Sequence, residues 1–435
     1  MISVNTRASI VLLYLFIALL FFAQDIISRK KFDERSVTFM KISGFGFPLI
    51  DLKMVPSELN SKVFEILVFL FFIFSFKMFC SKIKKYPLLF IQILFFILIL
   101  TGLFSDFILN SLYATLKFLS YFLFLAIVYR SFRYDANLPM YLFNLIVIYA
   151  VIFLILQLYF GLDFSLYGQL NEASINFSRY TSFSQDPQKM ATIAYMIAVV
   201  YLGSLYSKDG RLDYLNIVFF GLIVWIALLT GSRSSCVGFI AAAVLLFIFK
   251  FSIRNFLILS VSACFIYFFL SDYLLSQTLF QRILDFDDDL EGRSSLFWAE
   301  ALKIFYDNYL VGVGNGNFSF FMNNTIAYKI SYGKGMTADQ PESGYLLWLV
   351  ETGLCGSIAF ITLIVKILTY NNKRKNAEIL KFKLAYLVWV IGFVTVYSLS
   401  DTKIVYVLVL LTALIFNTKK QKNRRVSKNM QLVIA

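Results

Sequence analysis

Long runs of apolar residues, separated by short polar connections, make up most of this chain. A helix needs about 20 mostly apolar residues to cross a membrane, and the runs approach that length. The pattern predicts twelve spans, of which the eighth and the last are marginal in length. The predicted spans are Ala8–Gln24, Lys62–Cys80, Pro87–Phe104, Asn110–Tyr129, Leu138–Phe160, Lys189–Tyr206, Tyr214–Thr230, Ser234–Phe249, Asn255–Leu270, Gly344–Leu368, Phe382–Leu399 and Ile404–Phe416.

One long polar stretch, Ser271–Ser343, interrupts this pattern. It divides the chain into residues 1–270 with nine predicted spans, the stretch itself over 271–343, three further spans over 344–416, and a basic tail over 417–435. We therefore expect an all-α integral membrane protein with about 12 transmembrane helices and one long loop. The sequence shows no internal repeat, which argues against a transporter built from repeated halves.

The composition agrees with a membrane protein and limits the chemistry. Hydrophobic residues make up 59% of the chain, against about 45–50% in a soluble domain. The four cysteines lie in or beside apolar runs without metal-like spacing, so we expect neither a disulfide framework nor a metal site from them. The chain has no histidine. Catalysis would therefore depend on carboxylates, arginines, tyrosines or backbone groups.

The net charge of +14 comes mainly from basic residues in the connections between apolar runs. Basic connections favour the cytoplasmic side of a membrane, so they predict the topology of the chain and give no reason to expect a nucleic-acid partner. The basic connections are Lys82–Lys85, Arg130–Arg133, Lys373–Lys383 and the tail after Phe416. All of them fall on one side if both termini are cytoplasmic and the first apolar run is a retained span. The segment Arg29–Lys41 violates this arrangement. The opposite, outer side then receives the long loop and the turn at Gly231–Arg233.

Within the long loop, Gly292–Tyr306 has the apolar spacing of an amphipathic helix. Phe297, Ala301, Ile304 and Phe305 recur on one face, which we expect to lie against the membrane surface or the helix bundle. The following stretch Gly312–Phe318 lacks the spacing of nucleotide-binding loops. It predicts a turn in which backbones approach closely.

Two arginines stand where an anion could be held. Arg293 begins the predicted loop helix, where a cation opposes the helix dipole unless an anion shares the site. Alternatively, Arg293 pairs with the acidic cluster Asp285–Glu291. Arg233 lies in Thr230-Gly-Ser-Arg-Ser-Ser235, between two apolar helices, where a charge is costly. Its alternative role is to extend to lipid phosphates.

Further candidates flank the predicted spans. Arg179, just before the sixth span, either binds a sugar or a phosphate or belongs to an ordinary loop. Glu342 is a candidate general base, because partial desolvation raises the proton affinity of a carboxylate. Asp339 competes with it for that role, and an acid favoured at a helix start is the alternative interpretation of Glu342. Glu351 would be buried in the tenth span, either as a structural hydrogen-bonding group or as part of the floor of a site.

Four motifs in order carry a family resemblance. They are Thr-Gly-Ser-Arg-Ser-Ser at 230–235, Gly-Arg-x4-Trp-x2-Ala-Leu at 292–302, Leu-Val-Gly-Val-Gly-Asn-Gly-Asn-Phe at 310–318, and Glu-Ser-Gly-Tyr-Leu at 342–346 followed by Glu-Thr-Gly-Leu-x-Gly at 351–356. Together they resemble the bacterial O-antigen ligase/polymerase superfamily, over about residues 170–365.

The resemblance implies a metal-independent, cofactor-free glycosyltransferase with the long loop in the periplasm, similar to the all-helical enzymes that use lipid-linked sugars (a GT-C-like fold). Its substrate would be an undecaprenyl-diphosphate-linked oligosaccharide in the bacterial inner membrane. Arg233 and Arg293 would bind the diphosphate, and Arg179 matches a looser family position. Arg282 and Tyr345 are further candidates for binding diphosphate or glycan. Membrane lipid and a chain-length regulator protein are candidate partners.

One departure from the family bears on the reaction. The ligase branch carries a histidine base near the position of Glu342, and this chain has none. Either Glu342 replaces it, or the protein is a repeat-unit polymerase, which we favour. The alternatives are a ligase that transfers polymer to lipid A core and, from another class, a polysaccharide flippase or exporter.

Overall fold

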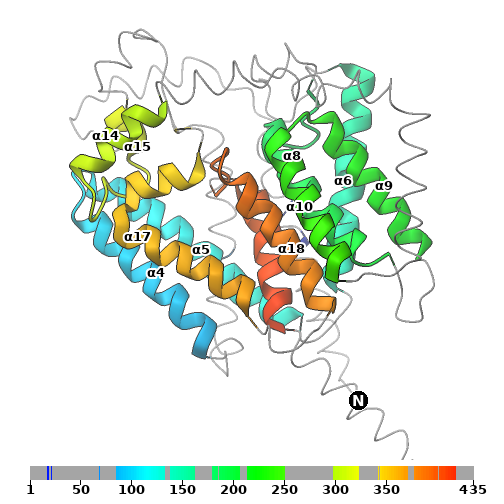
Figure 1. Ribbon diagram of the computed structural model, residues 1–435, viewed down its shortest axis with the longest axis horizontal. Coiled ribbons are helices and arrows are strands. Elements are labelled where there is room, and N and C mark those ends of the chain that lie inside the picture. The colour runs from blue at the N-terminus through cyan, green and yellow to red at the C-terminus, as the bar shows by residue number, and fades with distance from the viewer. Residues whose placement is uncertain are drawn as a thin grey trace, which may run out of the picture. The chain divides into compact units, whose positions relative to one another are not determined.

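Helices are the regular elements of this protein throughout the residues that the structure describes, and no strand occurs among them. The structure is a computed structural model that describes residues 17–18, 21, 68, 85–132, 138–161, 179–184, 186–205, 213–249, 297–322, 341, 343–370, 377–399 and 401–417. Figure 1 shows the helices, which fall into two compact units.

The helices of the first unit are α4 (Lys85–Leu103), α5 (Ile108–Ser131), α14 (Ala299–Asp307), α15 (Phe318–Met322) and α17 (Gly344–Thr369). Those of the second unit are α6 (Leu138–Phe160), α8 (Pro187–Leu202), α9 (Tyr214–Leu229), α10 (Arg233–Phe249) and α18 (Ala377–Gly392). A last helix, Thr402–Asn417, contributes residues to both.

Most predicted spans agree within a few residues with the helices that they overlap. Not every one of these helices is long enough to show that it crosses a membrane. Among the described residues, three helices have the length and composition to cross a membrane: Ile108–Ser131, Leu138–Phe160 and Gly344–Thr369. Shorter apolar helices are Ile91–Leu103, Tyr214–Leu229, Arg233–Phe249 and Thr402–Asn417. Three predicted spans cannot be compared with the structure. Asn255–Leu270 lies outside the described residues, as do all but one residue of Lys62–Cys80 and all but three of Ala8–Gln24. The total of twelve therefore stays a prediction.

The predicted span Phe382–Leu399 has the wrong bounds. The helix α18 begins earlier, at Ala377, and ends at Gly392. Beyond that glycine the chain turns tightly, with Thr395 N donating to Gly392 O at 3.1 Å. Glycine and the β-branched residues that follow it favour helix poorly, so an apolar run here continues past the end of the helix.

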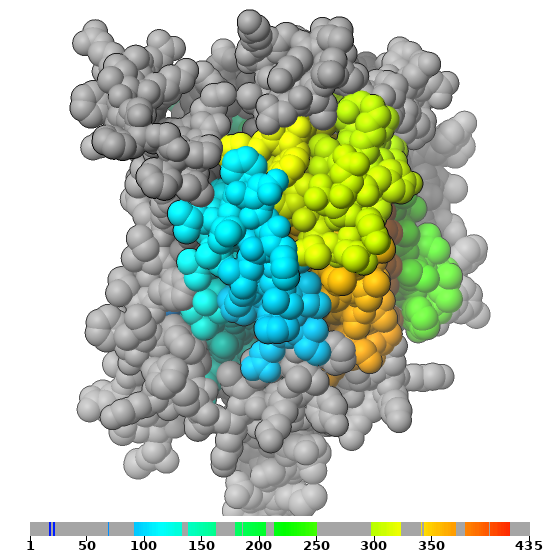
Figure 2. Space-filling model, turned by 90° about the vertical axis from the view of Figure 1, so that its left-hand side faces the viewer, coloured from blue at the N-terminus to red at the C-terminus, as the bar shows by residue number. Residues whose placement is uncertain are grey.

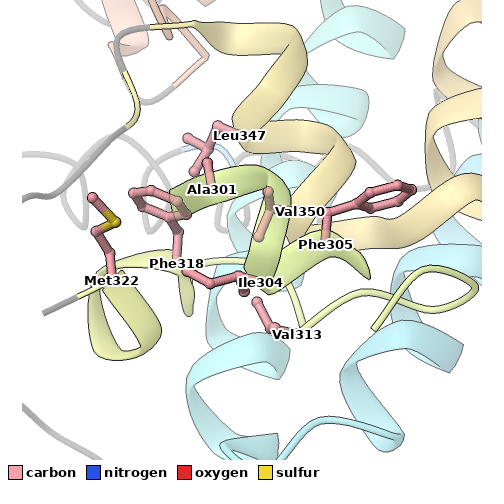
Figure 3. Close-up of a cluster of buried hydrophobic side chains, with 8 residues drawn as sticks. All are labelled: Ala301, Ile304, Phe305, Val313, Phe318, Met322, Leu347 and Val350. Carbon is pink, nitrogen blue, oxygen red and sulfur yellow. The ribbon is translucent and has the colours of Figure 1, made fainter. Parts of the chain in front are cut away.

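The amphipathic helix predicted in the long loop is confirmed over α14, and its apolar face packs on the helix bundle. Ala301, Ile304 and Phe305 are buried together with Leu347 and Val350 of α17. Figure 3 shows how side chains from α14, α15, α17 and the loop between α14 and α15 gather into this cluster. Burial of apolar area stabilises by about 25 cal/mol per Å², so this cluster holds the loop helix onto α17.

Helix α17 is broken at Gly353, which has φ +62° and ψ −167°. An unbroken helix would join the amides of Leu354 and Cys355 to the carbonyls of Val350 and Glu351. All four groups bond instead to the segment after α14. Leu354 N donates to Tyr309 O at 2.9 Å and Cys355 N to Leu310 O at 3.3 Å.

The same segment also donates hydrogen bonds to the two carbonyls of α17 that the break leaves without a helix partner. Val313 N donates to Val350 O at 3.0 Å, and Gly314 N donates to Glu351 O at 2.9 Å. A backbone polar group left unpaired in an apolar interior is costly. The break in α17 is therefore tolerated because the glycine loop, residues 308–318, replaces each lost hydrogen bond.

The other side of the glycine loop meets the turn between α4 and α5. Asn317 Nδ2 donates to Ser105 Oγ at 2.6 Å, to Ser111 Oγ at 2.9 Å and to Val313 O at 3.0 Å. Asn110 Nδ2 donates to Asn317 Oδ1 at 2.6 Å. Figure 2 shows the yellow-green residues of this region resting against the blue and cyan helices α4 and α5, with α17 in orange. The loop thus joins three helices of the first unit.

Replacing Asn317 with alanine is expected to destabilise the folded protein by about 2–3 kcal/mol, because it removes a buried amide whose acceptors at Ser105, Ser111 and Val313 are also buried. The measurement is the apparent Tm of detergent-purified protein. Asn308→Ala is the matched control, since the Asn308 amide donates within its own helix turn, to Ile304 O at 3.3 Å. Equal Tm shifts for the two variants would contradict the role of Asn317.

The second unit is built around α8, whose residues Met190–Tyr201 are all buried. Small residues allow close packing around it. An added Cβ at Gly238 of α10 would lie 3.0 Å from Val388 O of α18. Thr192 Oγ1 and Ser235 Oγ form a hydrogen bond of 3.0 Å between α8 and α10. These contacts fix the start of α10 against α8 and α18.

Candidate functional site

The turn between α9 and α10 has the tight geometry that its sequence predicts. Thr230 follows α9, with its Oγ1 donating to Ala227 O at 2.6 Å. Gly231 has φ +64°, a conformation that glycine adopts without strain. Arg233 is the first residue of α10 and is partly buried. The turn therefore places a guanidinium at the positive end of a helix dipole.

Arg179 lies in a non-helical stretch that packs against this turn. Its side chain is only 3% exposed, and its Nε donates to Thr230 O at 2.7 Å. The next residue, Tyr180, donates its amide to Leu229 O at 3.2 Å. Arg179 is thus hydrogen-bonded to the residue three positions before Arg233, so the structure brings together two of the predicted site residues.

Helix α6 supports the Arg179 segment through a residue that the sequence interpretation did not single out. Gln157 Nε2 donates to Thr181 Oγ1 at 2.8 Å, and Gln157 Oε1 accepts from Ser182 N at 2.7 Å. Ser182 has φ +50°, and its Oγ donates to Ala150 O at 2.8 Å. A polar side chain inside an apolar span is a signal of function or of a structural partner, and Gln157 carried that signal.

Two arginines lie near this turn among the residues that the structure describes. Arg179 and Arg233 supply two guanidinium groups, which are suited to bidentate hydrogen bonds with phosphate oxygens. The nearby carboxylate of Asp186 caps α8, with its Oδ1 accepting from Gln188 N at 2.7 Å. The start of α10 adds backbone amides and the favourable end of a dipole. This arrangement is chemically suited to binding an anion such as a diphosphate.

In the first unit, the start of α14 contacts the last residues of the long loop. Trp298 Nε1, beside the start of α14, donates to Pro341 O at 3.1 Å. Ser343 precedes α17, and its Oγ accepts from Leu346 N at 3.4 Å. Tyr345 lies in the first turn of α17 and is partly buried. Glu342, Arg293, Arg282 and Asp339 lie outside the described residues, so their assignments stay predictions.

Glu351 is a structural hydrogen-bonding group, one of the two roles expected for it. It is 4% exposed, and its Oε1 accepts from Phe318 N at 3.3 Å. Tyr397 packs against the apolar cluster that includes Leu347 and Val350 of α17. Glu351 therefore joins α17 to the start of α15 at the end of the glycine loop.

Within the part of the chain that the structure describes, no group of three or more cysteine, aspartate or glutamate side chains is arranged to hold a metal ion. No curated protein matches this chain. Residues 217–361 match the family described as O-antigen ligase, Wzy_C. This match covers about a third of the chain, from α9 to α17, and includes Arg233, α14 and the glycine loop, whereas Arg179 lies before it. This part of the chain is therefore similar to the O-antigen ligase family, which is consistent with the O-antigen ligase/polymerase superfamily that its motifs resemble.

Proposed function

We propose that this protein is a repeat-unit polymerase of surface polysaccharide biosynthesis in the bacterial inner membrane. It joins undecaprenyl-diphosphate-linked oligosaccharides at the periplasmic face. The observation that carries the proposal is a Wzy_C domain in a chain without a single histidine. A ligase of this family uses a histidine base, so the domain here needs a different base or a different reaction.

The reaction is a displacement at the anomeric carbon of the growing chain. The acceptor sugar hydroxyl forms the new bond to that carbon. The bond from the carbon to the diphosphate oxygen breaks, and its electron pair leaves with the diphosphate. Glu342 takes the hydroxyl proton, with Asp339 as the competing base. Arg233 and Arg293 balance the charge that develops on the diphosphate, an effect worth about 3–4 kcal/mol in a water-excluded site.

The arrangement of the second unit supports the role of Arg233. A guanidinium stabilises a transition state well only if it does not have to reorganise during the reaction. Arg233 follows a glycine turn whose Thr230 carbonyl is hydrogen-bonded to the buried Arg179. Arg179, Arg282 and Tyr345 then bind diphosphate or glycan without taking part in proton transfer. A chain-length regulator protein is a further proposed partner.

The ligase remains the second candidate, because the matching family is described as O-antigen ligase. In that reaction Glu342 takes the place of the histidine, and the acceptor is lipid A core.

The experiment that separates these functions is a deletion strain whose lipid-linked glycans are extracted and sized. For a polymerase we expect single repeat units on the lipid carrier and no long chains. Full-length polymer left on the carrier would show a ligase and overturn the polymerase. Repeat units confined to the cytoplasmic leaflet, detected by their protection from an added glycosidase, would show a flippase instead.

A further inference from the structure

Helix α14 has an exposed apolar side besides the buried side that packs on α17. Leu302 and Tyr306 are four residues apart, which places them on the same side of the helix. Both side chains are exposed, that of Tyr306 at 70%. In the turn that follows the helix, Tyr309 and Leu310 are exposed as well. We call these four residues the apolar patch of α14.

A third side of α14 is charged and exposed. Lys303 and Asp307 are also four residues apart, one position further along the chain than the apolar pair, and both are exposed. The Lys303 ammonium forms an ion pair with Glu300 in the first turn of the helix. A helix that carries an apolar side next to a charged one has the pattern of a helix that lies in the plane of a membrane surface.

The apolar patch adjoins the exposed face of a helix that is long and apolar enough to cross a membrane. The amides of Leu354 and Cys355 in α17 donate to the carbonyls of Tyr309 and Leu310, so the patch lies beside α17 just after the break at Gly353. From this level onward, exposed apolar side chains follow one side of α17: Leu354, Ile358, Ile361 and Val365. In Figure 2 the yellow-green residues of this region lie directly above the orange residues of α17.

The length of α17 after its break indicates where the membrane ends. At about 1.5 Å per residue, the part from Leu354 to Thr369 rises about 24 Å. The hydrocarbon core of a bilayer is about 30 Å thick. If this part of α17 crosses the core, then the level of Leu354 lies inside the core or at its boundary. Tyr309 and Leu310 lie at that same level, where the apolar ring and polar hydroxyl of a tyrosine are both accommodated.

We propose that the apolar patch of α14 is a membrane-binding surface that lies in the interfacial layer of the bilayer. Lipid is the occupant that the position implies, because the patch continues the side of α17 that faces lipid when this helix spans the membrane. The glycine loop, which follows the patch, is then held at the membrane surface by lipid as well as by α17. This inference goes beyond the proposed function and does not depend on it.

The test measures the depth of nitroxide labels on the full-length protein in vesicles of phosphatidylethanolamine and phosphatidylglycerol. The native cysteines are replaced by alanine, and Leu302→Cys and Tyr306→Cys are labelled one at a time. We expect both labels to be accessible to oxygen and shielded from a water-soluble nickel chelate, at a depth of about 5–10 Å into the boundary between headgroups and acyl chains. Lys303→Cys and Asp307→Cys are the matched controls, and their labels should be accessible to the nickel chelate.

Access of the nickel chelate to Leu302→Cys and Tyr306→Cys equal to that of the controls would place the patch in water and overturn the inference. Shielding of these two labels from both oxygen and nickel would overturn it as well, because protein then covers the patch. In that case, spin–spin broadening that disappears on dilution with unlabelled protein would identify a second copy as the cover, and its absence would identify another segment of the chain.

A second measurement keeps the native cysteines, in case the cysteine-free protein does not fold. In this version Tyr306→Trp is compared with Asp307→Trp in vesicles of lipids brominated near the headgroup end of their acyl chains. Bromine quenches tryptophan only at close range, so we expect the quenched fluorescence of Tyr306→Trp to exceed that of the unsubstituted protein, and that of Asp307→Trp to exceed it much less. Equal quenching for the two variants would contradict a membrane-binding surface on the Tyr306 side of α14.

Discussion

Alanine at Gly312 is expected to abolish accumulation of folded protein in the membrane. An added Cβ would lie 2.5 Å from the carbonyl carbon and oxygen of Glu351 and from the amide nitrogen of Gly353. All three are backbone atoms, which cannot rotate away. Gly312 also has φ +76°, which costs a residue with a Cβ about 1 kcal/mol or more.

The clash has a large effect because it falls where the glycine loop replaces the helix hydrogen bonds of α17. If the loop moves away, the carbonyls of Val350 and Glu351 lose Val313 N and Gly314 N. Each buried backbone group left unpaired costs about 1–3 kcal/mol. We therefore expect a loss of more than about 4 kcal/mol, which is a large fraction of the stability of a folded domain.

The measurement is the amount of detergent-extractable, monodisperse protein and its apparent Tm. Gly353→Ala should behave in the same way, because its Cβ would lie 2.4 Å from Leu310 O. Gly221→Ala is the control. Gly221 lies inside α9 with no atom within 4 Å of an added Cβ, so alanine there should be neutral or slightly stabilising. Normal yield and Tm for Gly312→Ala would show that the loop does not dock on α17.

The long helices and the loop helix were predictable because their signals are local. Apolar length alone located α6 at Leu138–Phe160, the bounds that the structure gives. The spacing of Ala301, Ile304 and Phe305 identified the buried face of α14. The glycine-rich stretch Gly312–Phe318 predicted close backbone approach, which the structure confirms at Gly312 against the backbone of Glu351 and Gly353. In each case the sequence pattern that predicts the element lies within the residues that form it.

The break in α17 was not predictable in the same way. Gly353 stands in a run apolar enough to span a membrane, and a glycine inside such a run does not by itself end a helix. The break exists because the backbone of residues 309–314, some 40 positions earlier, supplies the replacement partners. Arg179 and Gln157 illustrate the same limit, since their partners at Thr230 and Thr181 are set by tertiary packing.

For the candidate site, the sequence predicted which residues take part, and the structure shows the surroundings of only some of them, among them Arg179 and Arg233. Arg179 is buried, at 3% exposed, and its Nε donates to the Thr230 carbonyl, which is a structural contact, so its role in binding a sugar or a phosphate stays a prediction. Its hydrogen bond also means that it helps to shape the turn that carries Arg233. Arg233, which is partly buried at the start of α10, is therefore the better choice for a test of catalysis.

Arg233→Ala is expected to lower chain elongation by about a hundredfold to a thousandfold with normal protein levels. The expected loss matches removal of one preorganised donor from a transition state. The protein should fold, because the Arg179–Thr230 hydrogen bond and the Thr192–Ser235 hydrogen bond remain. The elongation activity of Arg233→Lys should lie between that of Arg233→Ala and that of the wild type, since lysine keeps the charge and loses the paired N–H geometry.

The measurement is polysaccharide length on gels from a deletion strain that carries each variant, with lipid-linked single repeat units quantified and normalised to protein in the membrane. Arg130→Ala is the matched control, because Arg130 lies in the last turn of α5, on the side predicted to be cytoplasmic. That variant should make normal long chains. If Arg233→Ala also makes them at equal protein levels, Arg233 does not stabilise the leaving diphosphate. If Arg233→Ala is inactive and Arg233→Lys is as active as wild type, charge alone suffices and the paired geometry is unnecessary.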